Sequence, residues 1–116
     1  MRYSLYIGRF QPFHNGHAWC IRQMIENGKK VCVAVMDIHN LEPDNNPYTY
    51  DEVLKKISED MKEELQNGQM MVTKIPAIES VNYGRDVGYS FNELKPPEEI
   101  KKISATKIRR KNDTNI

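Results

Sequence analysis

The chain has 116 residues, which is enough for one domain with a single hydrophobic core. Its composition, 39% hydrophobic and 28% charged, argues against a disordered, collagen-like or coiled-coil chain. The 17 basic and 16 acidic residues nearly balance, so the net charge neither indicates a nucleic-acid partner nor excludes an anionic metabolite. A nucleic-acid-binding module would rest only on the basic residues near the C-terminus, which lack interleaved aromatic residues, so we expect no nucleic-acid partner. The sequence shows neither an apolar run of membrane-spanning length nor an export signal, which predicts a cytoplasmic protein with no membrane partner.

The beginning of the chain predicts a strand, a helix and a second strand. A β-prone segment over residues 3–7 ends at Gly8. Apolar residues then recur at helical spacing from His17 until Asn27-Gly28, a pair typical of helix C-termini. Residues 31–36 are apolar without alternation, which is typical of a strand covered on both faces in a parallel sheet.

A loop, a second helix and a third strand follow. Residues 37–47 are rich in proline and asparagine and predict a loop that leaves the C-terminal end of the second strand. Thr49 is a suitable N-cap for a helix whose apolar stripe continues to Asn67-Gly68. Residues 70–75 predict a strand that is closed by Pro76.

The end of the chain is less regular. Residues 78–83 fit a loop or a fourth short strand, and Pro96-Pro97 indicates an extended connection. Residues 104–111 predict a final capped helix. We therefore expect a single domain over residues 1–111 and a polar tail over residues 112–116. The expected fold is a three-layer α/β sandwich around a mostly parallel, Rossmann-like sheet.

Residues 8–17, with the sequence GRFQPFHNGH, join the first strand to the first helix. Backbone N–H groups and the helix dipole make such a junction a site for anions, and phosphate is the anion we expect. Gly8 and Gly16 allow the backbone to approach a ligand closely. The chain has no P-loop and no dinucleotide-binding glycine pattern, so those two classes of nucleotide site lack support.

His14 and His17 are the candidate catalytic residues of this segment. Three residues apart at the entrance of a helix, they can donate hydrogen bonds to charge that develops on a phosphorus centre. Arg9 adds a permanent positive charge. The alternatives are two loop histidines satisfied by hydrogen bonds, or a metal site. No glutamate separates the histidines and no further ligands stand at fixed spacing, so we expect no metal held by direct protein ligands.

The sequence GRFQPFHNGH resembles the HxGH signature of the nucleotidyltransferase superfamily, which includes nicotinamide-mononucleotide adenylyltransferases and glycerol-3-phosphate cytidylyltransferases. Within the superfamily, this sequence is most similar to the archaeal-type adenylyltransferases. The resemblance implies that His14 and His17 hold the transferring α-phosphate, that Gly16 permits the close approach, and that Arg9 clamps phosphate. It also implies the reaction: a nucleoside monophosphate, adenylyl above all, passes from a nucleoside triphosphate with Mg²⁺ to the phosphate of a small metabolite, and pyrophosphate leaves.

Residues 103–109, ISATKIR, resemble a second motif of the same superfamily, ISxTxxR. The resemblance implies that Ser104 and Thr106 hold the leaving pyrophosphate and that Arg109 is a second phosphate clamp. Their hydroxyls and backbone N–H groups at a helix N-terminus suit that task, and Lys107 can neutralise the β- and γ-phosphates. The two motifs stand in the family's order, which a chance match to one pattern would not produce.

Further residues are assigned to the nucleotide by the same resemblance. Phe10 lies in the HxGH loop. Arg85 and Asp86 belong to the sequence YGRDVGY, which stands where related chains line the nucleotide pocket. A surface ion pair is the alternative for Arg85 and Asp86.

The acceptor side is the part of the site that the sequence defines least. Asp37, Tyr48 and Tyr50 lie in or just after the loop that follows the second strand, where we expect the acceptor, with loop polarity and packing as alternatives. Val53 stands where many relatives have an arginine, and residues 37–48 contain neither lysine nor arginine. The sequence therefore offers no matching cation for the acceptor's phosphate.

Two other functions stay open at this point. The short chain suits a cytidylyltransferase acting on a small phosphorylated alcohol or sugar. A catalytically silent nucleotide-binding sensor or partner domain is the second alternative. We also expect a homodimer, because loop residues such as Tyr48, Tyr50 and Phe91 would gain from burial in an interface.

Overall fold

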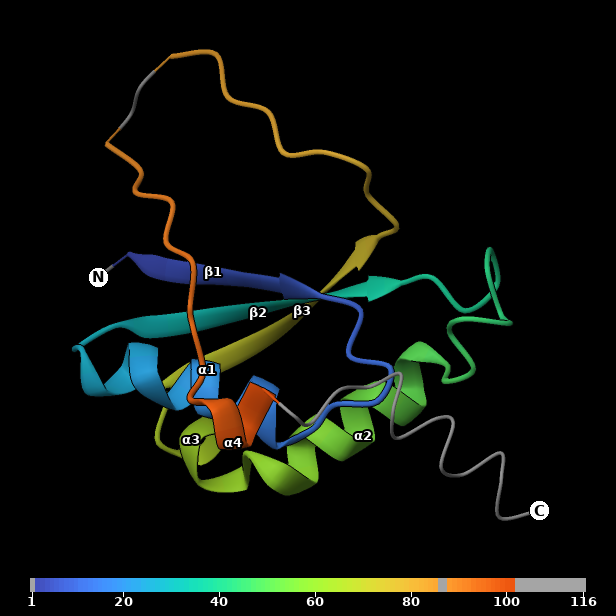
Figure 1. Cartoon of the computed structure of the whole chain (residues 1–116), viewed down its shortest axis with the longest axis horizontal. Coiled ribbons are helices and arrows are strands. Elements are labelled where there is room, and N and C mark those ends of the chain that lie inside the picture. Colours follow the sequence, from blue (N-terminus) through green and yellow to red (C-terminus); the bar gives the residue numbers. More distant parts are fainter. Residues whose placement is uncertain (1, 86–87, 102–116) are drawn as a thin grey trace.

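The computed structural model describes residues 2–85 and 88–101 (Figure 1). Its elements follow one another as β1 (Tyr3–Gly8), α1 (Asn15–Glu26), β2 (Lys30–Asp37), α2 (Tyr50–Asp60), α3 (Lys62–Gln66), β3 (Met70–Pro76) and α4 (Glu98–Lys101). The helices of these described stretches include none with the length and apolarity that a membrane crossing requires. The cytoplasmic location stays a prediction.

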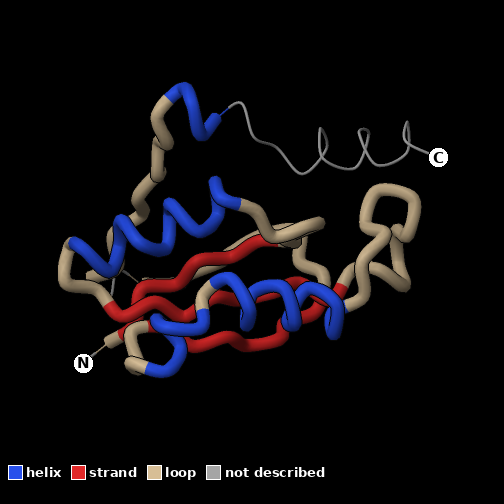
Figure 2. The backbone as a smooth tube through the Cα atoms, turned by 90° about the horizontal axis from the view of Figure 1, so that it is seen from below, coloured by secondary structure: helices blue, strands red, loops and turns tan. Residues whose placement is uncertain are grey.

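The three strands form one parallel sheet in the order β1-β2-β3. In the middle strand, Val33 pairs with Tyr6 of β1 and with Val72 of β3. Both strand-to-strand connections run through helices, and right-handed crossovers in the same direction place α1, α2 and α3 on one face (Figure 2). The predicted Rossmann-like parallel sheet is confirmed.

The core lies between this face and the helices. It consists of buried side chains from the loop between β1 and α1, from the helices and from the strands, namely Phe10, Phe13, Ala18, Ile21, Val31, Val33, Val35, Val53, Ile57, Met61 and Met70. Alternate residues of β2 point to opposite faces, so Val31, Val33 and Val35 all point toward the helices and are completely buried. The expected packing of a continuous apolar strand is thus present on this side.

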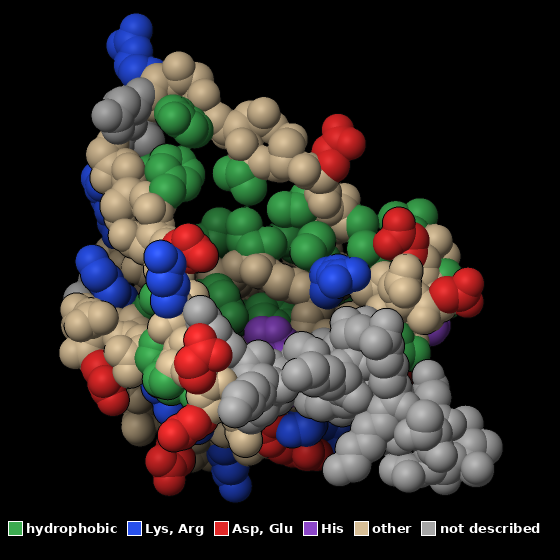
Figure 3. All heavy atoms as spheres, viewed as in Figure 1, with side chains coloured by type: hydrophobic (Ala, Val, Ile, Leu, Met, Phe, Trp, Pro, Cys, Tyr) green, Lys and Arg blue, Asp and Glu red, His purple; other side chains and the backbone are tan. Residues whose placement is uncertain are grey.

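The other face of the sheet has a different cover. Leu5 is 59% exposed and Met71 is 39% exposed, although both lie on strands that are paired with β2. The described parts of the connection between β3 and α4, residues 77–85 and 88–97, pass this face as an open arch (Figure 1), and hydrophobic side chains line the space between the arch and the sheet (Figure 3). Within the described residues, no helix forms the third layer of the predicted sandwich.

Two helix boundaries differ from the prediction. Helix α1 begins at Asn15, because the side chain of His14 accepts a hydrogen bond from the backbone of Gly16 and so acts as the N-cap. The predicted second helix is divided at Met61, whose backbone has φ −116° and ψ 29°. The side chain of Met61 is fully buried in the core, which favours a break at this residue over an uninterrupted helix.

The last described part decides between two predicted alternatives. Residues 78–83 form the loop and not the fourth strand, and Val81 and Tyr83 are each 62% exposed, so this segment has no buried face that would favour a strand. The short helix α4 was not predicted, although Pro97 before two glutamates is a known start signal. The final helix predicted over residues 104–111 and the domain boundary at 111 lie outside the described residues.

Candidate active site

The loop between β1 and α1 folds back onto the core. Phe10 has a positive φ of 54°, the Gln11–Pro12 peptide is cis, and the Phe10 and Phe13 side chains are 2% and 1% exposed. Phe10 occupies the space beside Gly8, where a Cβ atom would lie 2.8 Å from the ring. Glycine at position 8 therefore lets the aromatic ring close the end of β1.

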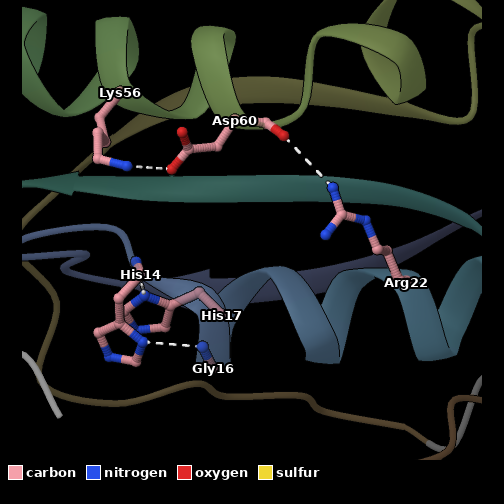
Figure 4. Close-up of polar contacts among 6 residues, drawn as sticks. All are labelled: His14, Gly16, His17, Arg22, Lys56 and Asp60. Carbon is pink, nitrogen blue, oxygen red and sulfur yellow. Dashed lines mark hydrogen bonds and ion pairs between the residues drawn. The ribbon is translucent and has the colours of Figure 1, made fainter. Parts of the chain in front are cut away.

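His14 and His17 form a reciprocal cap at the start of α1. The Nδ1 atom of His14 accepts a hydrogen bond from the backbone N–H of Gly16 at 3.0 Å, and the Nδ1 atom of His17 accepts one from the backbone N–H of His14 at 3.1 Å. The two rings stack with centroids 3.8 Å apart (Figure 4). A Cβ atom on residue 16 would lie 2.8 Å from the His14 ring, so only glycine allows this arrangement without displacement of the ring.

These capping bonds determine which ring nitrogen carries the proton. A backbone N–H group can only donate, so the Nδ1 atoms of His14 and His17 must both be acceptors. A neutral imidazole has one ring proton, which is then on Nε2 in each residue. The cap thus leaves two Nε2–H donors on neighbouring, stacked rings.

Burial keeps both histidines neutral. Burial, together with the neighbouring His14, lowers the pKa of His17 to about 3. Burial also lowers the pKa of His14. Two aromatic rings enclose His17: Phe10 meets it edge-on at 4.8 Å between centroids, and Phe13 lies at 5.5 Å.

Arg9 is supported from the loop that follows β2. Its guanidinium Nη1 lies 3.5 Å from Oδ1 of Asn46, a completely buried residue. The amide of Asn46 donates to the carbonyl of Glu42 at 2.9 Å, and Nδ1 of His39 donates to the carbonyl of Asn46 at 2.7 Å. The polar side chains of this loop therefore hold Asn46 in place beside Arg9.

Gln11 joins the same two loops. Its side-chain amide donates to the carbonyl of Tyr48 at 2.9 Å, and its Oε1 accepts from the backbone N–H of Tyr48 at 2.8 Å. Gln11 is 3% exposed. This two-bond contact fixes the HxGH loop against the residues that precede α2.

The C-terminal ends of β2 and β3 carry a second polar cluster. Nζ of Lys74 lies 3.4 Å from Oδ2 of Asp37 and 4.9 Å from the ring centroid of Tyr50. Asp37 is the last residue of β2 and Tyr50 is the first residue of α2. Three elements thus meet at one cationic side chain.

Comparisons with known proteins agree with this geometry. Residues 5–52 match the cytidylyltransferase-like family. The chain is also similar to proteins named nicotinamide-nucleotide adenylyltransferase, with 29% identity over 102 residues in Methanolobus tindarius and 27% over 99 residues in Haloarcula marismortui. Both findings support the resemblance to the HxGH nucleotidyltransferase superfamily that the motif in residues 8–17 carries.

The alignments cover a smaller share of the relatives than of this chain. The two alignments cover 81% and 78% of this chain, but 59% and 53% of the relatives. A protein of the same name from Methanospirillum hungatei is 35% identical over 46 residues, which are 40% of this chain and 26% of that protein. The chain spans about half the length of the curated relatives it matches.

The structure brings most of the HxGH-like segment of the chain together with the expected acceptor residues. The residues that meet around the C-terminal edge of the sheet are Gly8, Arg9, Phe10, His14, Gly16, His17, Asp37, Tyr48 and Tyr50. The side chain of Phe10 is 2% exposed and meets the His17 ring edge-on, so it supports the imidazole, and its contact with a nucleotide stays a prediction. Tyr48 and Tyr50 are half-buried, whereas Phe91 is 69% exposed.

Other predicted residues are not joined to this group. Arg85 is exposed on the connection between β3 and α4. Asp86, Ser104, Thr106, Lys107 and Arg109 lie outside the described residues, and so does the second motif. Over the ranges that are described, no group of three or more histidine, cysteine or acidic side chains could hold a metal ion.

Three residues of this region were missed by the sequence reasoning, namely Gln11, Asn46 and Lys74. Gln11 lies inside the recognised motif, so its contact with Tyr48 could have been sought there. Asn46 was taken as one of several loop formers, and its complete burial had no signal in the sequence. Lys74 lies at the end of a predicted strand, where polar residues of parallel sheets often serve ligands.

Proposed function

We propose that this protein transfers an adenylyl group from ATP to the phosphate of a small metabolite. An oxygen of the acceptor phosphate forms a bond to the α-phosphorus of ATP. The bond from that phosphorus to the bridging oxygen of the β-phosphate breaks, and pyrophosphate leaves with the electron pair. The observation that carries this proposal is the pair of neutral imidazoles at the start of α1, whose Nε2–H groups are not used for capping.

In this proposal the chain supplies alignment and charge, and it supplies no covalent nucleophile. His14 and His17 donate to the oxygens of the α-phosphate, where negative charge accumulates as the new bond forms. The donors are oriented by the helix cap before substrate arrives, so little reorganisation is needed during the reaction. Arg9 and the N-terminus of α1 add positive potential beside them.

The proposal assigns the leaving pyrophosphate to Ser104, Thr106, Lys107 and Arg109. It is supported by the order of the two motifs and by α4, which directly precedes the second motif and contacts α1. A side-chain atom of Ile100 in α4 lies 3.6 Å from the place of a Cβ on Gly16. Mg²⁺ belongs to the substrate in this account, because it enters as the counter-ion of the triphosphate.

Nicotinamide mononucleotide is the acceptor that we propose first. The similar archaeal proteins are named nicotinamide-nucleotide adenylyltransferase, and two of them align with about four fifths of this chain. Arg85 and Asp86 are proposed to line the nucleotide pocket, and Asp37, Tyr48 and Tyr50 the acceptor pocket. Cytidylyl transfer is the second candidate, because the matching family is described as cytidylyltransferase-like.

The experiment is a matrix of substrates. The protein is incubated with Mg²⁺, one of ATP, CTP, GTP or UTP, and either nicotinamide mononucleotide or glycerol 3-phosphate, and pyrophosphate release is followed. We expect release with ATP and nicotinamide mononucleotide. Release with CTP and glycerol 3-phosphate would select the second candidate, and ATP binding without pyrophosphate release from any pair would contradict transfer and support a nucleotide sensor.

A further inference from the structure

The acceptor side of the site has one strand-borne cation. The segments that leave the three strands at their C-terminal ends are residues 8–14, 37–49 and 74–77, and within them Arg9 and Lys74 carry the positive charge. The first turn of α2 carries Asp51 and Glu52, and Val53 is 2% exposed and packs in the core. A cation for the acceptor's phosphate must therefore come from another element than the first turn of α2.

We propose that Lys74 binds the phosphate of the acceptor, an inference that rests on the proposed function and identifies the anion-binding group of its acceptor site. Its position supports this role. Gly8 and Lys74 both pair with Val35, on opposite sides of β2. Two strand spacings separate them, which is about 10 Å between backbones. Lys74 thus lies in the same row of the sheet as the start of the HxGH loop, on the far side of the central strand.

Residues 46–50, which lead into α2, are held by contacts with both sides of the site. In the segment that enters α2, every second residue contacts a different part of the site: Asn46 contacts Arg9, Tyr48 is bound by Gln11, and Tyr50 lies beneath Lys74. The segment thereby links the HxGH loop to the end of β3. A ligand phosphate between the two cations would have this segment as its wall.

The surroundings of Lys74 leave capacity for an anion. Its side chain is 55% exposed, and its ammonium group has three donors, of which the Asp37 carboxylate engages one. An exposed ion pair of this kind contributes little to stability. The Tyr50 ring and Asp37 instead hold the ammonium group at the edge of the sheet, where ligands of parallel α/β proteins bind.

The test compares Lys74→Gln with Lys74→Arg and with Lys30→Gln, a control at the opposite end of the same sheet. For Lys74→Gln we expect the KM for nicotinamide mononucleotide to rise about tenfold or more, with the KM for ATP and kcat changed by less than about threefold. Lys74→Arg should restore most of the loss, and Lys30→Gln should match the wild type. An unchanged KM for nicotinamide mononucleotide, or an equal rise in both KM values, would overturn the proposal.

A binding measurement separates this proposal from the function on which it rests. If the wild type releases no pyrophosphate with any substrate pair, the proposed function fails. Calorimetric titration with nicotinamide mononucleotide and with inorganic phosphate then tests Lys74 directly. Binding by the wild type that weakens at least about tenfold in Lys74→Gln supports an anion site at Lys74, and absent or equal binding in the two proteins overturns it.

Discussion

The two faces of the sheet differ in how they are covered and in what they support. On the helix-covered face, Val33 is completely buried, and the loops that carry the HxGH residues extend from this packed layer. On the opposite face, Leu5 is 59% exposed, and residues 77–85 and 88–97 pass this face as an arch (Figure 1). An apolar strand residue on the helix-covered face therefore contributes more to the free energy of unfolding than one on the open face. The HxGH loop adjoins the face with the denser packing.

The largest expected effect is a difference in stability between substitutions on the two faces of the sheet. Ile57→Ala removes a completely buried side chain from the covered face and should lower the free energy of unfolding by about 2–5 kcal/mol. Leu5→Ala on the open face should lower it by less than about 1 kcal/mol, because much of that side chain is already in contact with water. Denaturant unfolding followed by circular dichroism measures both values. Equal losses would contradict the difference between the faces.

The half-buried histidines at the start of α1 should make stability depend on pH. An unfolded histidine titrates near pH 6.5, whereas burial lowers the pKa of His17 to about 3 in the folded protein. Between these values the unfolded state binds more protons, so the free energy of unfolding should fall as pH decreases from about 6.5 towards about 3. The check is a series of unfolding curves across this range. His17→Asn should reduce the slope, and a slope equal to that of the wild type would contradict the assignment.

The open face bears on the predicted homodimer. Leu5, Met71, Tyr83 and Phe91 are exposed apolar or aromatic side chains, and pairing of two copies would remove part of such surface from water. Tyr48 and Tyr50 contribute less than expected, because both are half-buried within one chain. Light scattering at micromolar concentrations should give twice the chain mass of 13.6 kDa. A monomer mass throughout that range would contradict the prediction.

Local sequence patterns predicted the elements that carry the site. The β-prone run before Gly8 and the helix stop at Asn27-Gly28 are short-range signals, and β1 and α1 end where these signals stand. The role of His14 as N-cap was not predicted, because histidine is an uncommon capping residue. Its Nδ1 accepts the bond that a serine or aspartate oxygen would accept elsewhere.

The contacts between loops could not be derived in the same way. Gln11 and Tyr48 are 37 positions apart, and their pairing depends on how two crossover connections bring different strand ends to one edge. The same holds for Lys74, which meets Asp37 and Tyr50 only after β3 has paired with β2. The spacing of residues along the sequence gives no direct information about such tertiary contacts.

The measurement that tests the central claim most directly is the turnover of His17→Asn with ATP and nicotinamide mononucleotide. Asparagine keeps a side-chain oxygen near Nδ1, which can still accept the bond from the His14 backbone, but it has no donor at the place of Nε2. We predict a loss of about a hundredfold to a thousandfold in kcat with little change in the KM for ATP and an intact fold. Wild-type turnover in the folded variant would contradict the donation of that proton to the transferring phosphate.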